Sequence, residues 1–336
     1  MSRLFGRRRL TFSIYLIMNM KLTHLLFTLI AFLVMTSGKA QKASADIPYR
    51  FATRAEAQML ITDIDAYTNG WNQFDLNVRL QTQNGRKSQL LKLAMESTLN
   101  WSDADKAKLN KAFAKIETAI KKQNLKLPVP SEVILMKTSM AEEGGATAYT
   151  RENWIAVGEK ALEKATEDEL ARLMAHELFH VLTRADLAFK KKTYETIGFT
   201  VLDRPIAFPS DLMQKLISNP DVSRRDSYAP FTIEGESVNC TMVTYTDAPY
   251  AEGTLFQYIK VGLVPLNEQF VPLQQNGATV IYTLEQASDF QSRVGKNTAY
   301  VIDPEEVLAD NFSYVLFSKA DLPDPQLVES LKKAMQ

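Results

Sequence analysis

The apolar residues between about residues 47 and 123 recur at intervals of three and four, the spacing of amphipathic helices. Thr53 with Glu56 forms a capping box before the first predicted helix, and Ser102 caps the third. The apolar positions of the three helices are Ala57, Leu60, Ile61 and Ile64, then Leu90, Leu91, Leu93, Ala94 and Leu99, then Leu109, Phe113, Ile116 and Ile120. This pattern predicts a helical N-terminal region over residues 41–128, which we interpret as a scaffold or a wall beside a substrate.

The period changes after Pro128 and Pro130. Residues 132–137 (EVILMK) and 146–157 (ATAYTRENWIAV) are rich in β-branched and aromatic residues, which is typical of strands. The long stretch 190–299 mixes short apolar runs with turn signals. The chain is therefore predicted to have an α+β fold, in which a small mixed sheet follows the helical region.

Two further helices are predicted beyond the strands. Thr166 begins a capping box with Glu169, and the helix behind it has one apolar side. In residues 303–312, Asp303 is placed as an N-cap and Pro304 occupies the first helical position, where its missing N–H is not needed. Both helices carry acidic residues in the first turn, which the helix dipole favours.

The N-terminus has the pattern of an export signal. Lys21 precedes an apolar run from Leu25 to Met35, and Gly38 and Ala40 follow it as small residues at a cleavage site. The run is shorter than the roughly 20 apolar residues that span a membrane. Residues 1–40 are thus predicted to be a signal peptide, with Met20 as a possible true start, and an uncleaved anchor is the alternative. The mature chain is predicted to be exported, to the periplasm or the medium, without stable insertion into a membrane.

Composition and charge exclude some classes of function. Apolar and charged residues make up 46% and 23% of the chain, as in an ordinary globular protein. Residues 1–40 hold six Lys and Arg and no acid, so the remainder has 33 Lys and Arg against 39 Asp and Glu, a net charge of −6. This balance gives no sign of nucleic-acid binding. Cys240, the only cysteine, cannot form an internal disulfide and is predicted to be a buried apolar residue.

The predicted helix after Thr166 contains the sequence His176-Glu177-Leu178-Phe179-His180, a His-Glu-x-x-His motif. Residues four apart lie on one face of a helix, so both imidazoles can reach one metal ion. Catalytic zinc takes three protein ligands and keeps one position open. We therefore predict one Zn²⁺ per chain, bound by His176 and His180, with Glu177 as the general base that activates zinc-bound water.

The third ligand is predicted to be a carboxylate, because the remaining histidine, His24, lies in the signal. With this motif the chain resembles the gluzincin metallopeptidases, such as thermolysin, in which a Glu-x-x-x-Asp pattern on a later helix completes the site. The resemblance implies that Glu306 is the third ligand and that Asp310 supports His176. Glu305 is the alternative ligand, and otherwise we expect it to be a solvated first-turn acid. Glu234 and Glu236 are further candidates on a predicted loop.

The resemblance implies a zincin-like domain over residues 129–336 and hydrolysis of peptide bonds in a peptide or protein substrate. Since 126 residues separate His180 from Glu306, residues 190–299 are predicted to be an inserted segment. The strand before the motif helix would be a sheet edge that pairs with the substrate, which makes Tyr149, Arg151 and Asn153 candidate substrate-binding residues. The oxyanion donor is expected among Tyr245, Tyr250, Tyr258, Tyr282, Tyr300 and Tyr314.

A function from another class stays open at this stage. The chain could be an exported zinc-binding or scaffold protein that retains the motif without turnover. A structural zinc site is usually closed by four ligands. Cys240 is the one residue of the sequence that could supply a thiolate as the fourth ligand.

Overall fold

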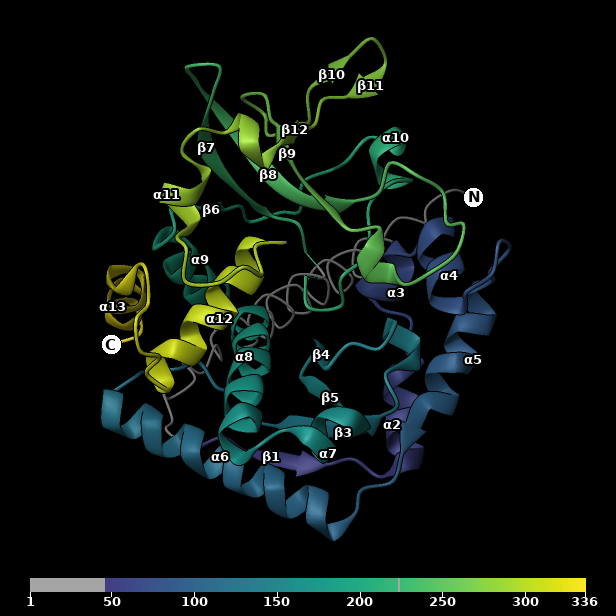
Figure 1. The fold of residues 1–336 in the computed structure, drawn as a ribbon, viewed down its shortest axis with the longest axis vertical. Helices are drawn as coiled ribbons and strands as arrows, with labels where there is room; N and C mark the ends of the chain where they lie inside the picture. The colour runs from purple at the N-terminus through teal and green to yellow at the C-terminus, as the bar shows by residue number, and fades with distance from the viewer. Residues whose placement is uncertain (1–45, 223) are drawn as a thin grey trace, which may run out of the picture. The chain divides into compact units, whose positions relative to one another are not determined.

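The first helices form where side chains satisfy their free backbone N–H groups. The computed structural model describes residues 46–336 except residue 223, so the predicted signal at 1–40 lies outside the described residues (Figure 1). The side chains of Thr53 and Ser102 accept hydrogen bonds from the backbone N–H three residues on, and Ser102 forms a full capping box with Asp105. The capping box predicted at Thr53 is only half formed, because the Glu56 carboxylate binds Arg50 instead. The helices of this region are α2 (Arg54–Ile61), α3 (Ala66–Gly70), α4 (Gln73–Leu80), α5 (Lys87–Ser97) and α6 (Asp103–Gln123).

The helical prediction for this region was wrong at two short segments. Residues Tyr49–Phe51 form strand β1 and residues Thr98–Leu99 form strand β2, and both pair with β3 (Val133–Thr138). Strands of two or three residues are too short to show the alternation of apolar and polar residues, so they were assigned to the neighbouring helices. Ile64, expected on the apolar face, is 58% exposed because α2 ends at Ile61.

The first sheet is mixed, as predicted, and has the order β1-β3-β5-β4 with β2 beside β3. Strand β5 (Trp154–Gly158) runs parallel to β3, and β4 (Ala148–Arg151) runs antiparallel to β5. The single predicted run 146–157 is thus a tight hairpin, turned at Glu152 with a φ of 45°. Among the described strands β4 pairs only with β5, so it forms an edge of this sheet.

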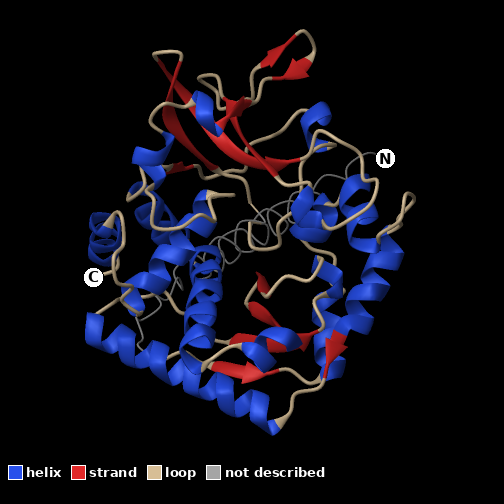
Figure 2. Cartoon of the chain, in the orientation of Figure 1, coloured by secondary structure: helices blue, strands red, loops and turns tan. Residues whose placement is uncertain are grey.

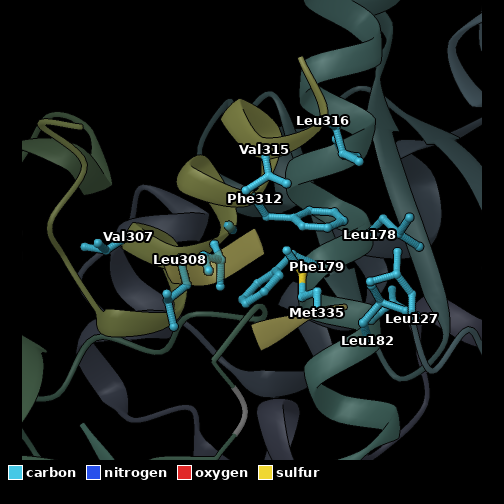
Figure 3. Packing of buried hydrophobic residues seen from close by; sticks show 14 of the residues in the cluster. Leu127, Leu178, Phe179, Leu182, Val307, Leu308, Phe312, Val315, Leu316 and Met335 are labelled. Carbon is cyan, nitrogen blue, oxygen red and sulfur yellow. The ribbon is translucent and has the colours of Figure 1, made fainter. Parts of the chain in front are cut away.

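The predicted motif helix is α8 (Glu167–Ala185), which packs against α6 on one side and α12 (Pro304–Leu316) on the other. Figure 3 shows the core between α8 and α12, where Phe179 faces Phe312 with ring centroids 5.5 Å apart. The other labelled residues of this core are Leu127, Leu178, Leu182, Val307, Leu308, Val315, Leu316 and Met335. This apolar contact fixes the two helices side by side, although 118 residues lie between the end of α8 at Ala185 and the start of α12 at Pro304.

The stretch 190–299 contains a second sheet, antiparallel throughout, with the order β12-β9-β8-β7-β6. Figure 2 shows it at the opposite end of the view from the first sheet. Its strands are β6 (Thr200–Val201), β7 (Ser227–Ile233), β8 (Glu236–Tyr245), β9 (Lys260–Pro265) and β12 (Tyr282–Thr283), and a hairpin of β10 (Gln274–Gln275) and β11 (Ala278–Thr279) projects beside them. Glu234 and Gly235 form the turn between β7 and β8. Cys240 lies on β8 and is buried, as predicted.

Short helices connect the remaining parts. They are η1 (Ala141–Glu143), α7 (Glu159–Lys164), α9 (Leu187–Glu195), α10 (Ser210–Met213), η2 (Leu255–Gln257), η3 (Leu284–Gln286), α11 (Phe290–Val294) and α13 (Pro325–Ala334). The fold is therefore α+β, which confirms the predicted class. None of the helices within residues 46–336 is long and apolar enough to cross a membrane.

Candidate metal centre

Helix α8 presents both motif histidines to one point. Its N-terminus is fixed by the reciprocal hydrogen bonds of Thr166 and Glu169, and its apolar side is buried in the core. The imidazole rings of His176 and His180, four residues apart, have centroids 4.8 Å apart. The side chain of His176 is 15% exposed and that of His180 is fully buried. The pair is thus held on the inner side of the helix, with one ring accessible.

Helix α12 brings a carboxylate to the same point. Asp303 accepts a hydrogen bond from the backbone N–H of Glu305, so the first turn of α12 is capped and aimed at α8. The Oε2 atom of Glu306 lies 3.1 Å from His176 Nε2 and 3.5 Å from His180 Nε2. The ligand atoms of these three residues all lie within 4.8 Å of one another. Two imidazoles and one carboxylate at this spacing could hold a metal ion.

The other nitrogen of each ring faces a second carboxylate. Asp310 Oδ1 lies 2.9 Å from His176 Nδ1, and Glu305 Oε1 lies 3.2 Å from His180 Nδ1. A proton on Nδ1 satisfies both contacts and leaves the Nε2 lone pairs directed at Glu306. The Nε2 atom of His180 is buried and has no hydrogen-bond partner among the described residues. A buried nitrogen left in this state fits a metal ligand, because an unpaired buried polar atom is otherwise costly.

The expectation that Glu305 is a solvated acid in the first turn of its helix was wrong. It is 3% exposed and accepts hydrogen bonds of 2.5 Å from Thr183 Oγ1 and Tyr194 OH, in addition to its contact with His180. The first turn of α12 lies against α8 and α9, so both acids of the Glu305-Glu306 pair point into protein. Glu305 thus contacts the candidate ligand His180 from behind, while Glu306 faces the two Nε2 atoms.

Glu177 lies beside the three candidate ligands and is 3% exposed. Its Oε2 atom has no hydrogen-bond partner within the described part of the chain. Burial, together with the negative charge of Asp221, raises the pKa of Glu177 to about 8. For His176, burial disfavours the proton, but hydrogen bonds to Asp310 and Glu306 outweigh it and raise the pKa to about 10. The site therefore concentrates negative charge, which a divalent cation would neutralise.

Asp221 forms a second possible metal group with Glu177 and His180, again with ligand atoms within 4.8 Å. Since the Nδ1 of His180 faces Glu305, only its Nε2 is available, and one lone pair serves one metal ion. Both groups would need the same Nε2 atom of His180, so only one of them can bind a metal ion through this residue at a time. The sequence Asn219-Pro220-Asp221 is a turn signal, so it predicted neither the position of Asp221 beside Glu177 nor the hydrogen bond of 2.7 Å that Asn219 Nδ2 donates to Glu306 Oε1.

A cavity of about 620 Å³ opens beside His176, Glu177 and Glu306. Its wall includes Ala148 and Tyr149 at the β4 edge. Further lining residues come from α8, from the segment after α10, from η2 and from the loop before α12, among them Leu173, Ile217, Leu255, Phe256 and Tyr300. Through this cavity, whose wall is largely apolar, a molecule can reach His176 and Glu306.

The three candidate substrate-binding residues are not brought together. Tyr149 lines the cavity and donates its hydroxyl to Glu142 Oε1 at 3.2 Å. Arg151 is 3% exposed and donates to Asp65 Oδ2 at 2.7 Å. Asn153 donates to the backbone oxygen of Glu132 at 3.0 Å. Arg151 and Asn153 therefore bind other parts of the protein and do not line the cavity, because they lie toward the hairpin turn.

Two of the six candidate tyrosines line the cavity, Tyr300 and Tyr314. The ring centroid of Tyr300 lies 6.4 Å from that of the candidate ligand His176. Burial, and then the charge of Glu306, raise the pKa of Tyr300 above its ordinary value, so its hydroxyl keeps its proton. The other four tyrosines do not line this cavity.

Fold and site together define an α+β protein with a candidate metal centre of two histidines and one glutamate. Residues 135–187 match the model of a family described as the eCIS core domain. The matched stretch runs from β3 to the start of α9, so it includes His176, Glu177 and His180 and ends well before Glu306. No curated protein and no solved structure matches the chain.

Proposed function

We propose that this protein is a zinc-dependent peptidase of the gluzincin type. The observation that carries the proposal is the position of Glu177, a buried carboxylate with an unpartnered oxygen beside two histidines and Glu306, at the wall of an open cavity. This combination supplies the ligand set of a catalytic zinc site together with a base, and a purely structural site needs no base.

The metal we assign to the site is Zn²⁺, one ion per chain. Imidazole nitrogen and carboxylate oxygen are ordinary zinc ligands, and three protein ligands are typical of catalytic zinc. His176, His180 and Glu306 would hold the ion, with Asp310 and Glu305 fixing the two rings. Bound there, Zn²⁺ would supply a Lewis acid that polarises a carbonyl group and lowers the pKa of water.

Glu177 would move the proton. In the metal-free protein the pKa of Glu177 is raised to about 8, and the positive charge of a bound Zn²⁺ would lower it, so that the carboxylate could accept a proton from attacking water and return it to the leaving amine near neutral pH. The hydroxyl of Tyr300, which remains protonated in the cavity wall, would donate a hydrogen bond to the developing oxyanion.

The substrate we propose is an extended segment of a peptide or protein. Ala148 and Tyr149 on the edge strand β4 line the cavity, and an extended chain can add as another strand at the Ala148 end of this edge, since the backbone N–H of Thr150 is already bound by Asp221. We further propose that the predicted signal at residues 1–40 directs this activity out of the cytoplasm, to the periplasm or the medium.

The proposal is tested by incubating the zinc-loaded protein with a mixed peptide library and identifying new termini by mass spectrometry. Glu177→Gln removes the base but no ligand, so this variant should bind zinc and cleave about 10²- to 10⁴-fold more slowly than the wild type. Glu163→Gln, the same change at an exposed position of α7, is the matched control and should cleave like the wild type. Cleavage by Glu177→Gln at the wild-type rate would contradict the assignment of the base.

A second candidate function is a metal-binding scaffold without turnover, favoured by the match of residues 135–187 to the eCIS core domain. The structure does not support a scaffold in which Cys240 is the fourth metal ligand. Its thiol lies on β8 and belongs to neither metal group of the described residues. Zinc binding by the wild type without cleavage of any library member would favour the scaffold over the peptidase.

A further inference from the structure

The segment of residues 218–221 joins the N-terminal helices to the candidate metal centre. Asp75 on α4 accepts hydrogen bonds from Ser218, from its backbone N at 3.0 Å and from its Oγ at 2.7 Å. Arg79, one helical turn further on, donates to the backbone oxygen of Ser218 at 2.7 Å. Both backbone polar groups of Ser218 are therefore fixed by a helix 143 positions earlier in the chain.

The anchor is rigid because its charges are fully buried. The Asp75 and Arg79 side chains are both 0% exposed and form an ion pair of 2.8 Å. Arg79 also pairs with Glu143 Oε2 at 2.9 Å. A buried guanidinium that left these partners would carry an uncompensated charge, so this arrangement permits little movement of the segment.

Two hydrogen bonds set the orientation of the Asn219 amide. Its Oδ1 accepts from the backbone N of Asp221 at 3.0 Å. Its Nδ2 therefore points the other way and donates to Glu306 Oε1 at 2.7 Å. Asp221 is fixed in turn, since its Oδ1 accepts from the backbone N and the hydroxyl of Thr150 on β4. The Nδ2 group that donates to Glu306 is thus kept in place by contacts of its segment with strand β4 and with helix α4.

We propose that Asn219 is a positioning residue that holds Glu306 as a one-oxygen metal ligand. With Oε1 taken by the amide, Glu306 offers only Oε2, the oxygen that faces both Nε2 atoms. A carboxylate free to bind through two oxygens would occupy a further coordination position. Asn219 therefore keeps open the position that substrate or water needs. This inference rests on the metal site of the proposed function and not on peptidase activity.

The test uses Co²⁺ as a spectroscopic probe in the full chain. Four-coordinate Co²⁺ absorbs visible light much more strongly than five-coordinate Co²⁺, so the spectrum reports whether Glu306 binds through one oxygen or two. Wild type is expected to show the intense four-coordinate bands. Asn219→Ala is expected to lose most of this intensity while still binding one Co²⁺. Asn219→Leu keeps the volume without the donor and gives the same readout if the alanine variant fails to fold.

Asn153→Ala is the matched control, because it also removes one side-chain donor to an oxygen, near the turn after β4 and outside the metal site. It should keep the wild-type spectrum. A wild-type spectrum in the folded Asn219 variants would overturn the role of Asn219. Failure of the wild type to bind any Co²⁺ would instead overturn the metal centre itself, so the two failures are distinguishable.

Discussion

The Nδ1 atom of His180 lies 3.2 Å from the Oε1 atom of Glu305, while its Nε2 atom faces Glu306, the next residue of the same helix, at 3.5 Å. One imidazole is thus held between two adjacent carboxylates of α12. Glu305 fixes the orientation of the ring, and Glu306 could bind the same metal ion as the ring. His176 also lies between two carboxylates of α12, with Asp310 at its Nδ1 and Glu306 at its Nε2.

Glu305→Gln should weaken zinc binding by about 10- to 100-fold, the usual effect of losing a carboxylate that orients a ligating histidine. The neutral amide is a poorer acceptor for His180 Nδ1 and no longer raises the basicity of the ring. Competition with a chelator of known affinity measures the change. Glu195→Gln, at the end of α9, is a surface control that should bind zinc like the wild type. Unchanged affinity in Glu305→Gln would remove Glu305 from the site.

Arg79→Met should lower the free energy of unfolding by about 3–5 kcal/mol, because it leaves the buried acids Asp75 and Glu143 without their counter-charge. Urea unfolding of the metal-free protein measures the loss. Arg54→Met changes an exposed arginine in the first turn of α2 and should shift the value by no more than about 0.5 kcal/mol. Equal effects of both substitutions would show that the Arg79 ion pairs contribute no specific stability.

The metal-free protein should become less stable as pH rises from 5 to 8. The folded protein holds a proton on Glu177 up to about pH 8 and on Asp303 up to about pH 7, whereas the unfolded chain loses both near the ordinary carboxyl pKa. His176, with its pKa raised to about 10, acts in the same direction above its ordinary value. Urea unfolding at several pH values measures the slope, and Glu177→Gln should reduce it. A rise in stability over this range would contradict the buried protons.

Zinc affinity should increase with pH over the same range. The ion requires the free Nε2 lone pair of His176, and protons compete for the ring up to about pH 10. Calorimetry in buffers of different ionisation enthalpy would count the protons released on binding. Proton release that stays at zero at pH 6 would contradict a site that contains His176.

The elements that have local signals, such as helix caps and regular residue spacing, could be predicted from the sequence. The capping residues Thr166 and Asp303 mark the starts of α8 and α12 in the structure, and the four-residue spacings place both histidines, and Glu306 with Asp310, on single faces. The structure brings these four residues together, although their metal-binding role remains a prediction.

The rest depends on contacts between distant segments. Nothing local distinguishes a buried Glu305 from a solvated one, because its burial is decided by Tyr194 and Thr183 on other helices. The link from Asp75 to Ser218 joins segments that no short pattern connects. Arg151 was placed correctly on a strand, but its side chain pairs with Asp65 in the N-terminal region, which strand periodicity alone does not show.

The most direct test of the account is the rate of cleavage of an unstructured protein substrate per bound zinc, measured for wild type and for Glu177→Gln. The zinc content of both is determined by mass spectrometry of the intact protein. The account predicts one zinc per chain in each and a cleavage rate in Glu177→Gln that is lower by about 10²- to 10⁴-fold, the contribution of a general base. Equal rates in the two proteins, or cleavage by the wild type without zinc, would contradict it.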